Sequence, residues 1–147
     1  MKKIIFLSLL ALSILSVTAQ NVSVPAVVQQ TYNSMYTSAP SWQLANGNYI
    51  GSFTENGKNK TATFLTDGSW VKTEEIVPFA SLSSIVQQEV NQRFLNGGTA
   101  HVLEESRLVN MPDGNYEAVK MAISNTPTHI VIYFNAQGVM AKRELSQ

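Results

Sequence analysis

Few side chains in this sequence could carry out acid–base or metal chemistry. The chain has two histidines, His101 and His129, and no cysteine. The histidines are far apart in the sequence, and neither lies in a metal-binding spacing such as His-Glu-x-x-His. We therefore expect both to be residues of strand surfaces and neither to be a metal ligand or a general base.

Two pairs of adjacent carboxylates, Glu74-Glu75 and Glu104-Glu105, are the next candidates. Both lie in strand-like runs, where neighbouring side chains point to opposite faces, so neither pair can share a proton or a substrate. Asp113-Gly114-Asn115 resembles the start of a calcium loop, but the later ligands are missing, which favours a hairpin turn. The sequence thus predicts that the protein is not an enzyme and has no cofactor and no metal site.

The element that must position the remaining candidates is a predicted β-hairpin. Strand-forming runs flank Asp67-Gly68, a dipeptide typical of a two-residue type I′ turn. In that register Phe64 pairs with Val71 and Leu65 pairs with Trp70. The pattern returns near the end of the chain, which indicates a duplicated unit. The matching positions are Phe64 and Phe134, Gly68 and Gly138, Lys72 and Lys142, and Glu74 and Glu144.

The first residues are typical of a secretory signal peptide. Lys2 and Lys3 precede an apolar run from Ile4 to Val17, and small residues precede a predicted cleavage after Ala19. An uncleaved anchor is the alternative, but the run is shorter than the ~20 apolar residues that a membrane span needs. Residues 1–19 are therefore predicted to be a signal peptide. The mature chain is predicted to be periplasmic or secreted, with no membrane anchor after cleavage.

Each predicted unit begins with a helix. Apolar and aromatic residues recur at spacings of three and four after Pro25 and again after Pro78. Four strand-length runs follow each helix, and most of the turns between them contain glycine, as in an antiparallel meander. We predict one unit over residues 20–76 and a second over residues 77–147. The fold class is α+β, with both units forming one curved antiparallel sheet that carries the helices on one face.

The turns fix which face of the sheet each side chain occupies. Asn46-Gly47 and Asn56-Gly57 are typical two-residue turns, and their register places alternate residues against the helices. Tyr116 stays undecided, because its similarity to Tyr49 places it in the core, whereas alternation from Val119 places it on the open face. A β-bulge would reconcile the two. The predicted core face consists of Trp42, Leu44, Tyr49, Gly51, Phe53, Ala62, Phe64 and Val71 in unit 1, and of Val119, Met121, Ile123, Ile130, Ile132, Phe134 and Ala141 in unit 2.

Trp70 is the leading candidate for a functional side chain, because the predicted register turns it away from the helices. Trp and Tyr are favoured anchors in protein interfaces. Partial burial against neighbouring loops is the alternative, since single exposed apolar residues need no functional explanation. The residues predicted to bind a partner on the open face are Leu65, Trp70, Lys72, Val131, Tyr133 and Met140.

The paired helix-plus-meander units, the aromatic strands, the Asp-Gly-type hairpin and the apolar-x-Lys-x-Glu ending together resemble the periplasmic PepSY-like family of the Bacteroidetes, also described as β-lactamase-inhibitor-like. The resemblance covers nearly the whole mature chain. It implies two tandem units with a free concave sheet face, a binding or inhibitory role and no catalytic residues. Met140 in place of Trp70 and Gln137 in place of Asp67 depart from the pattern, which implies that the two halves contribute unequally.

The charge of the chain excludes some partners. It carries 10 basic and 10 acidic side chains, and loss of Lys2 and Lys3 with the leader leaves a formal charge of −2. No basic stripe is present, so nucleic acid is not an expected partner. We predict a non-enzymatic module that recognises a protein or peptide partner with its open sheet face. The alternative is a carbohydrate- or small-ligand-binding protein in which Trp70 or Tyr133 stacks on the ligand.

Overall fold

Eight strands form one antiparallel sheet in which each strand pairs with its neighbours in the sequence. The computed structural model describes residues 22–96 and 101–146; the predicted signal peptide with its cleavage site, and Gly97-Gly98 after the second helix, lie outside the described residues. The predicted α+β class and meander order are confirmed. The strands are β1 (Ser41–Ala45), β2 (Asn48–Glu55), β3 (Lys58–Phe64), β4 (Trp70–Val77), β5 (His101–Met111), β6 (Gly114–Ile123), β7 (His129–Phe134) and β8 (Met140–Ser146).

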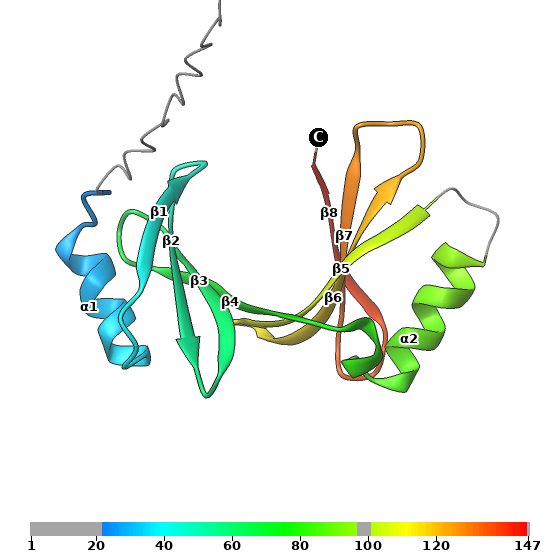
Figure 1. Cartoon of the computed structure of the whole chain (residues 1–147), viewed down its shortest axis with the longest axis horizontal. Coiled ribbons are helices and arrows are strands. Elements are labelled where there is room, and N and C mark those ends of the chain that lie inside the picture. Colours follow the sequence, from blue (N-terminus) through cyan, green and yellow to red (C-terminus); the bar gives the residue numbers. More distant parts are fainter. Residues whose placement is uncertain (1–21, 97–100, 147) are drawn as a thin grey trace, which may run out of the picture.

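Two helices cover one face of this sheet. The first, α1 (Ala26–Met35), precedes β1, and the second, α2 (Ser84–Val90), lies between β4 and β5 and continues into a π-helical turn over Asn91–Leu95. A short 3₁₀ turn, Phe79–Ser81, precedes α2. The sheet bends into a U with the helices outside it, so its other face is concave and carries no helix (Figure 1). The division into residues 20–76 and 77–147 stays a prediction, because the two halves share this one sheet.

The first two hairpins have the predicted turns. Asn46 and Gly47 have φ values of 52° and 77°, and Asn56 and Gly57 have 52° and 75°, as a type I′ turn requires at both central positions. Leu44 therefore pairs with Tyr49, and Tyr49 with Phe64, as the sequence predicts.

The hairpin at Asp67-Gly68 differs from the prediction. Gly68 has a φ of 86°, whereas Asp67 does not have a positive φ, so this is not a type I′ turn. The Gly68 amide donates to the Leu65 carbonyl at 3.1 Å, and the Leu65 amide donates to the Ser69 carbonyl at 2.9 Å. This is a three-residue loop with a glycine bulge. The strand register shifts next to it, so Phe64 pairs with Trp70, and the predicted Phe64–Val71 and Leu65–Trp70 pairs are wrong.

The corresponding loop of the second half has the same geometry. The Gly138 amide donates to the Asn135 carbonyl at 2.9 Å, and the Asn135 amide donates to the Val139 carbonyl at 3.0 Å. The register shifts at the same point, so that Phe134 pairs with Met140. The similarity of the two hairpins in sequence is therefore a similarity in structure.

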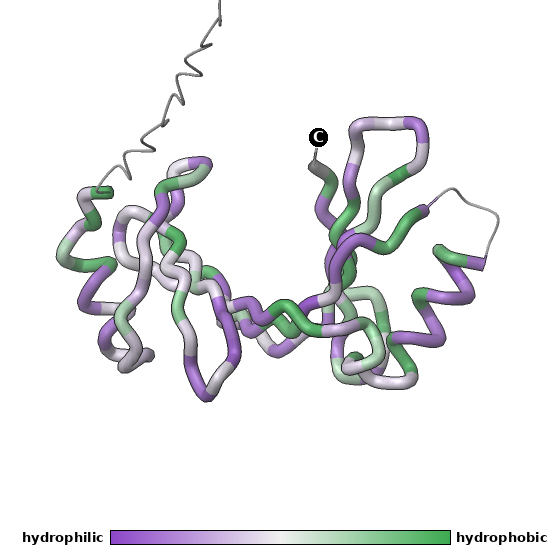
Figure 2. The backbone as a smooth tube through the Cα atoms, viewed as in Figure 1, coloured by the Kyte–Doolittle hydropathy of each residue, from purple (hydrophilic) through white to green (hydrophobic). Residues whose placement is uncertain are grey.

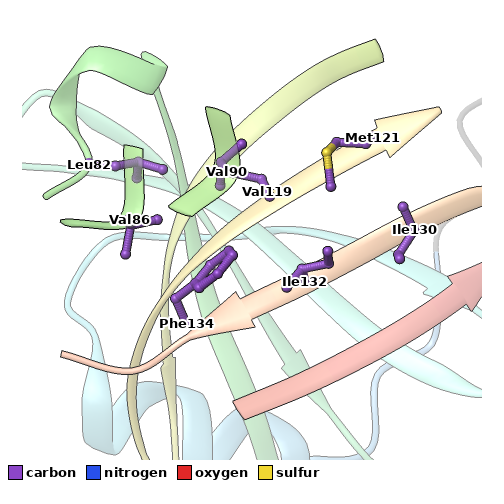
Figure 3. Close-up of a cluster of buried hydrophobic side chains, with 8 residues drawn as sticks. All are labelled: Leu82, Val86, Val90, Val119, Met121, Ile130, Ile132 and Phe134. Carbon is purple, nitrogen blue, oxygen red and sulfur yellow. The ribbon is translucent and has the colours of Figure 1, made fainter. Parts of the chain in front are cut away.

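Each helix packs on its own hydrophobic cluster. Figure 3 shows α2 above β6 and β7, and the hydropathy along the α2 backbone alternates in Figure 2 as an amphipathic helix requires. Phe64 and Phe134 are 0% and 1% exposed, so both are core anchors as predicted. The α1 cluster contains Val28, Tyr32, Phe53, Ala62 and Phe64. The α2 cluster contains Leu82, Val86, Val90, Val119, Met121, Ile130, Ile132 and Phe134.

Some predicted core positions are wrong. Ala141 is exposed, because it is the bulge residue that has no partner on β7, between the Phe134–Met140 and Tyr133–Lys142 pairs. Val71 is half-buried and lines a hollow together with Lys72 on the concave side, because the bulge places Trp70 opposite Phe64 instead. Leu44 is on the predicted face but 51% exposed, since β1 is an edge strand.

Tyr116 lies on the concave face. It pairs with Val109 and packs in a concave-side cluster with Tyr133. Alternation from Val119 is therefore the correct derivation, and the bulge of this strand pair lies in β5, between Leu103 and Glu105. Glu117, which pairs with Phe134, is the structural counterpart of Tyr49, which pairs with Phe64. The sequence similarity that aligns Tyr116 with Tyr49 is thus displaced by one residue from the strand pairing, which aligns Glu117 with Tyr49.

The bulge glycines also let each hairpin approach its helix. A Cβ at Gly68 would lie 2.7 Å from Val27 Cγ2, and a Cβ at Gly138 would lie 2.7 Å from Ile85 Cγ1. We expect Gly68→Ala and Gly138→Ala each to lower the free energy of unfolding by roughly 2–3 kcal/mol, from left-handed strain plus crowding. Urea denaturation of the two variants would measure this.

Gly47→Ala is the matched control, because Gly47 has a similar φ of 77° but nothing within 4 Å of its added Cβ. It should lose only about 1 kcal/mol, from strain alone. Equal losses at Gly47 and Gly68 would contradict a role for the hairpin–helix contact.

Candidate functional site

A third hydrophobic cluster lies on the concave face, opposite the helices. Its buried members come from β5, β6 and β7, which form the base and one arm of the U (Figure 1). Figure 2 shows both hydrophobic and hydrophilic stretches at the base of the U, where the middle strands overlap in this view. We call this set the concave cluster: Val109, Met111, Tyr116, Ala118, Val131 and Tyr133.

Tyr133 is the centre of the concave cluster. It is 1% exposed although it faces away from the helices, and its hydroxyl donates to Glu144 Oε2 at 3.1 Å. Burial, together with the Glu144 carboxylate, raises the pKa of Tyr133, so the hydroxyl stays protonated and acts as a donor. Tyr133 is therefore on the predicted face, but its ring is a buried structural element that is not accessible to a partner.

Tyr116 presents more of its side chain than Tyr133. Its ring packs edge-on against Tyr133 with the centroids 6.3 Å apart, and Lys142 Nζ lies 4.8 Å from the Tyr116 ring centroid. Lys142 also pairs with Asp113 at 2.6 Å. The hydrogen bond from Lys142 lowers the pKa of Asp113, and the reverse effect raises the pKa of Lys142, so both are charged at neutral pH.

Charged residues extend the concave face next to this cluster. Glu74 Oε1 accepts from Arg107 Nη1 at 2.8 Å and from Lys72 Nζ at 3.1 Å. Arg107 Nε also pairs with Glu105. Burial by itself would lower the pKa of Arg107, but the Glu74 and Glu105 carboxylates outweigh it, and the net shift is upward. This arrangement joins β4 to β5 across the middle of the sheet.

The two histidines differ in their surroundings: His101 packs edge-on against Phe94 with the ring centroids 5.6 Å apart, whereas His129 joins a group of surface charges. His129 Nδ1 lies 3.0 Å from Glu104 Oε2, and Lys120 lies 3.4 Å from the same oxygen. Glu75 pairs with Lys58, away from the ion pairs of Glu74, as predicted for this pair. Glu104 and Glu105 lie at the β5 bulge and share a face with Lys120, so the prediction that these two carboxylates point to opposite faces is wrong. The described residues contain no group of three or more His, Asp or Glu side chains that could hold a metal ion.

A hollow of about 440 Å³ lies at the rim of the concave cluster. The register shift next to Trp70 is the reason that Val71 reaches it. The sequence does not predict this hollow, because its residues come from three hairpins that only the bend of the sheet brings together. Its lining residues are Val71, Lys72, Met111, Pro112, Asp113, Lys142 and Glu144.

The predicted partner-binding residues do not all share one surface. Lys72 lines the hollow, and Val131 belongs to the concave cluster with Tyr133. Leu65 lies in the β3–β4 loop and is 42% exposed, and Met140 lies opposite the core residue Phe134 and is 39% exposed. The predicted open-face position of Met140 is therefore wrong.

Trp70 lies on the helix side of the sheet, so the prediction that it lies on the open face is wrong. It packs against the α1 cluster, and its indole Nε1 donates to Thr73 Oγ1 at 3.0 Å. The same Thr73 oxygen makes a hydrogen bond with the Tyr36 hydroxyl at the end of α1. The physical reason is the three-residue loop, which places Trp70 opposite Phe64. The bulge at Val71 then restores the predicted register, so that Lys72 pairs with Thr63 on the concave face.

We expect Trp70→Ala to lower the free energy of unfolding by about 2–4 kcal/mol, because it removes a large ring from the edge of the α1 cluster. Denaturant titration at constant m-value would measure the loss. Met140→Ala is the matched control at the same position of the second hairpin and should cost less than ~1 kcal/mol. If both variants lose the same stability, Trp70 does not support α1.

Comparison with solved structures shows proteins of the same fold in Bacteroides. A DUF2874 family protein from Bacteroides ovatus is 23% identical with a TM-score of 0.66, over 84% of this chain and 89% of that one. A candidate periplasmic protein from Bacteroides eggerthii is 20% identical with a TM-score of 0.65, over 84% and 90%. A BLIP-like protein from Bacteroides fragilis is 15% identical with a TM-score of 0.65, over 86% and 89%.

These structures confirm, at the level of the fold, the resemblance that the sequence indicates. No protein-family model matches the chain, and no curated protein matches it. Among the described residues, no helix has the length and apolar character to cross a membrane.

Proposed function

We propose that this protein is a non-enzymatic binding module of the periplasm that recognises a protein or peptide with the concave face of its sheet. The observation that carries the proposal is the concave cluster, an apolar surface whose accessible aromatic side chain is Tyr116 and whose charged neighbours are already paired with one another. The BLIP-like neighbour supports a binding role, and the neighbour from Bacteroides eggerthii supports the compartment.

The size of the concave face suits a macromolecular partner. Eight strands, spaced ~4.8 Å apart and roughly 20 Å long, offer about 770 Å². This is close to the ~800 Å² that each partner contributes to a standard interface.

The charges on this face also suit a protein interface. Lys72, Arg107 and Lys142 each pair with a carboxylate of the same chain. A partner that covers them therefore buries ion pairs and no unpaired charge. Burying an ion pair costs less free energy than burying a single unpaired charge. An inhibitory role would follow if the partner were an enzyme whose active site this face covers.

The two residues predicted to stack on a carbohydrate, Trp70 and Tyr133, are not available for it. Trp70 packs on the α1 cluster and Tyr133 is 1% exposed, so neither ring offers a free face for stacking on a sugar. Tyr116 has Lys142 over its ring. The concave face therefore favours a protein or peptide over a glycan.

The distribution of lysines allows a direct test. Lys72, Lys120 and Lys142 lie on the concave side, whereas Lys60 pairs across the sheet with the core residue Phe53 on the helix side. Lysine acetylation of the protein, alone and bound to a partner captured from periplasmic extract, should show protection of the three concave lysines. Lys60 should react at the same rate in both samples. Protection of Lys60 with free reaction of Lys72 and Lys142 would place the interface elsewhere.

A further inference from the structure

The two edges of the sheet differ in their protection against pairing with another strand. Open sheet edges are normally guarded by charge, proline or a bulge. The last strand, β8, carries Lys142, Arg143 and Glu144, and a register shift lies at its start. The first strand, β1, consists of five uncharged residues and contains no proline. Within the described part of the chain β1 pairs with β2 alone, so its outer edge has no strand beside it.

The backbone groups on this outer edge belong to two residues. The type I′ turn at Asn46-Gly47 makes Ala45 and Asn48 a hydrogen-bonded pair, and such pairs alternate along the ladder. Ser41, Gln43 and Ala45 therefore bond inward to β2. Trp42 and Leu44 direct their N–H and C=O groups outward.

These outward groups are complementary to the same strand of a second copy. An antiparallel pairing centred on Gln43 sets Trp42 of one copy opposite Leu44 of the other, twice, around a two-fold axis. All four outward-directed residues then exchange their hydrogen bonds. Directly opposed residues share a face, so the 51% exposed Leu44 side chain would pack on an indole. Removing this apolar side chain from water would stabilise the pairing.

The opposite edge does not allow the same arrangement. A pairing of two β8 strands centred on Arg143 would place two guanidinium groups directly opposite each other, which is destabilising. The chain thus has one self-complementary edge and one guarded edge.

We propose that β1 is a self-association edge at which two copies of this chain pair antiparallel and join their sheets into one. The contact is a single short strand pair, so it belongs to the class of small, transient interfaces below ~1,200 Å². The concave face is left open in both copies, because the contact lies at the edge of the sheet. The dimer would therefore present two such faces side by side, and it does not depend on what those faces bind.

A single engineered thiol tests the register, because the chain has no cysteine of its own. Gln43 would be a non-hydrogen-bonded pair with itself, with Cα atoms ~4.5 Å apart, which lies within the range for a disulfide. Gln43→Cys should therefore form a covalent dimer rapidly on treatment with diamide, as seen on non-reducing gels. Arg143→Cys, at the centre of the guarded edge, is the matched control and should cross-link at least tenfold more slowly.

A second substitution separates pairing from chance collision. Leu44→Lys in the Gln43→Cys background replaces an exposed side chain, so the fold is retained, and it adds a charge to the edge. It should slow cross-linking at least tenfold. The proposal is overturned if the Gln43→Cys and Arg143→Cys variants cross-link at equal rates, or if Leu44→Lys leaves the rate unchanged.

Discussion

Phe64→Ala and Phe134→Ala should each lower the free energy of unfolding by about 3–5 kcal/mol. Each ring is at most 1% exposed and occupies the same position of its hairpin, opposite the first residue of the following strand. Removing a fully buried ring loses its transfer free energy and leaves a cavity. The loss is a large part of the ~5–15 kcal/mol that a domain of this kind has available.

Urea denaturation followed by two signals would measure this loss of stability and show whether the two halves of the chain unfold together. Both tryptophans, Trp42 and Trp70, belong to the half that carries α1. Their fluorescence therefore reports on that half, whereas far-ultraviolet circular dichroism reports on the whole chain. Because β4 and β5 join the halves in one sheet, the two transitions should coincide in Phe134→Ala as well as in Phe64→Ala.

Two results would contradict this view. A loss below ~1 kcal/mol at either phenylalanine would show that the paired hairpins are not equivalent anchors. Fluorescence that is unchanged in Phe134→Ala while circular dichroism shifts would show that the halves unfold separately. If an alanine variant does not fold at all, Phe134→Leu and Phe64→Leu give the same comparison with a smaller cavity.

The second large effect concerns binding. Tyr116→Ala should weaken the affinity for a concave-face partner by at least ~2 kcal/mol, about thirtyfold, since it removes the most accessible aromatic side chain of the concave cluster. Titration calorimetry with the captured partner would measure the change. The cost in stability should be smaller than at Phe64, because Tyr116 is only half-buried.

Two control variants make this result specific. Tyr116→Phe keeps the ring and should bind nearly as the wild type does. Ile85→Ala removes a 45% exposed side chain from α2, on the other side of the sheet, and should leave the affinity unchanged. If Tyr116→Ala binds the partner as tightly as the wild type, the concave cluster is a structural feature and no interface.

Much of the fold follows from local signals in the sequence. The Asn46-Gly47 and Asn56-Gly57 turns determine register within a few residues, because a type I′ turn needs a positive φ at both central positions. The meander order follows from short turns, the core position of Phe64 follows from alternation away from those turns, and that of Phe134 follows from its match to Phe64. None of these features depends on contacts between distant parts of the chain.

The tertiary structure alone decided the facing of Trp70 and the composition of the candidate site. Asp67-Gly68 is compatible with a two-residue or a three-residue loop, and the difference of one residue places Trp70 on the helix side before the bulge at Val71 restores the register. The bend of the sheet decided that Tyr133 is buried on the side away from the helices. The pairing of β4 with β5 brought Glu74 to Arg107, and the bend of the sheet brought Asp113 to Lys142. Such contacts join residues that are far apart in the sequence. Local periodicity predicts the face of a strand on which a residue lies, but it does not predict the curvature that brings distant strands together.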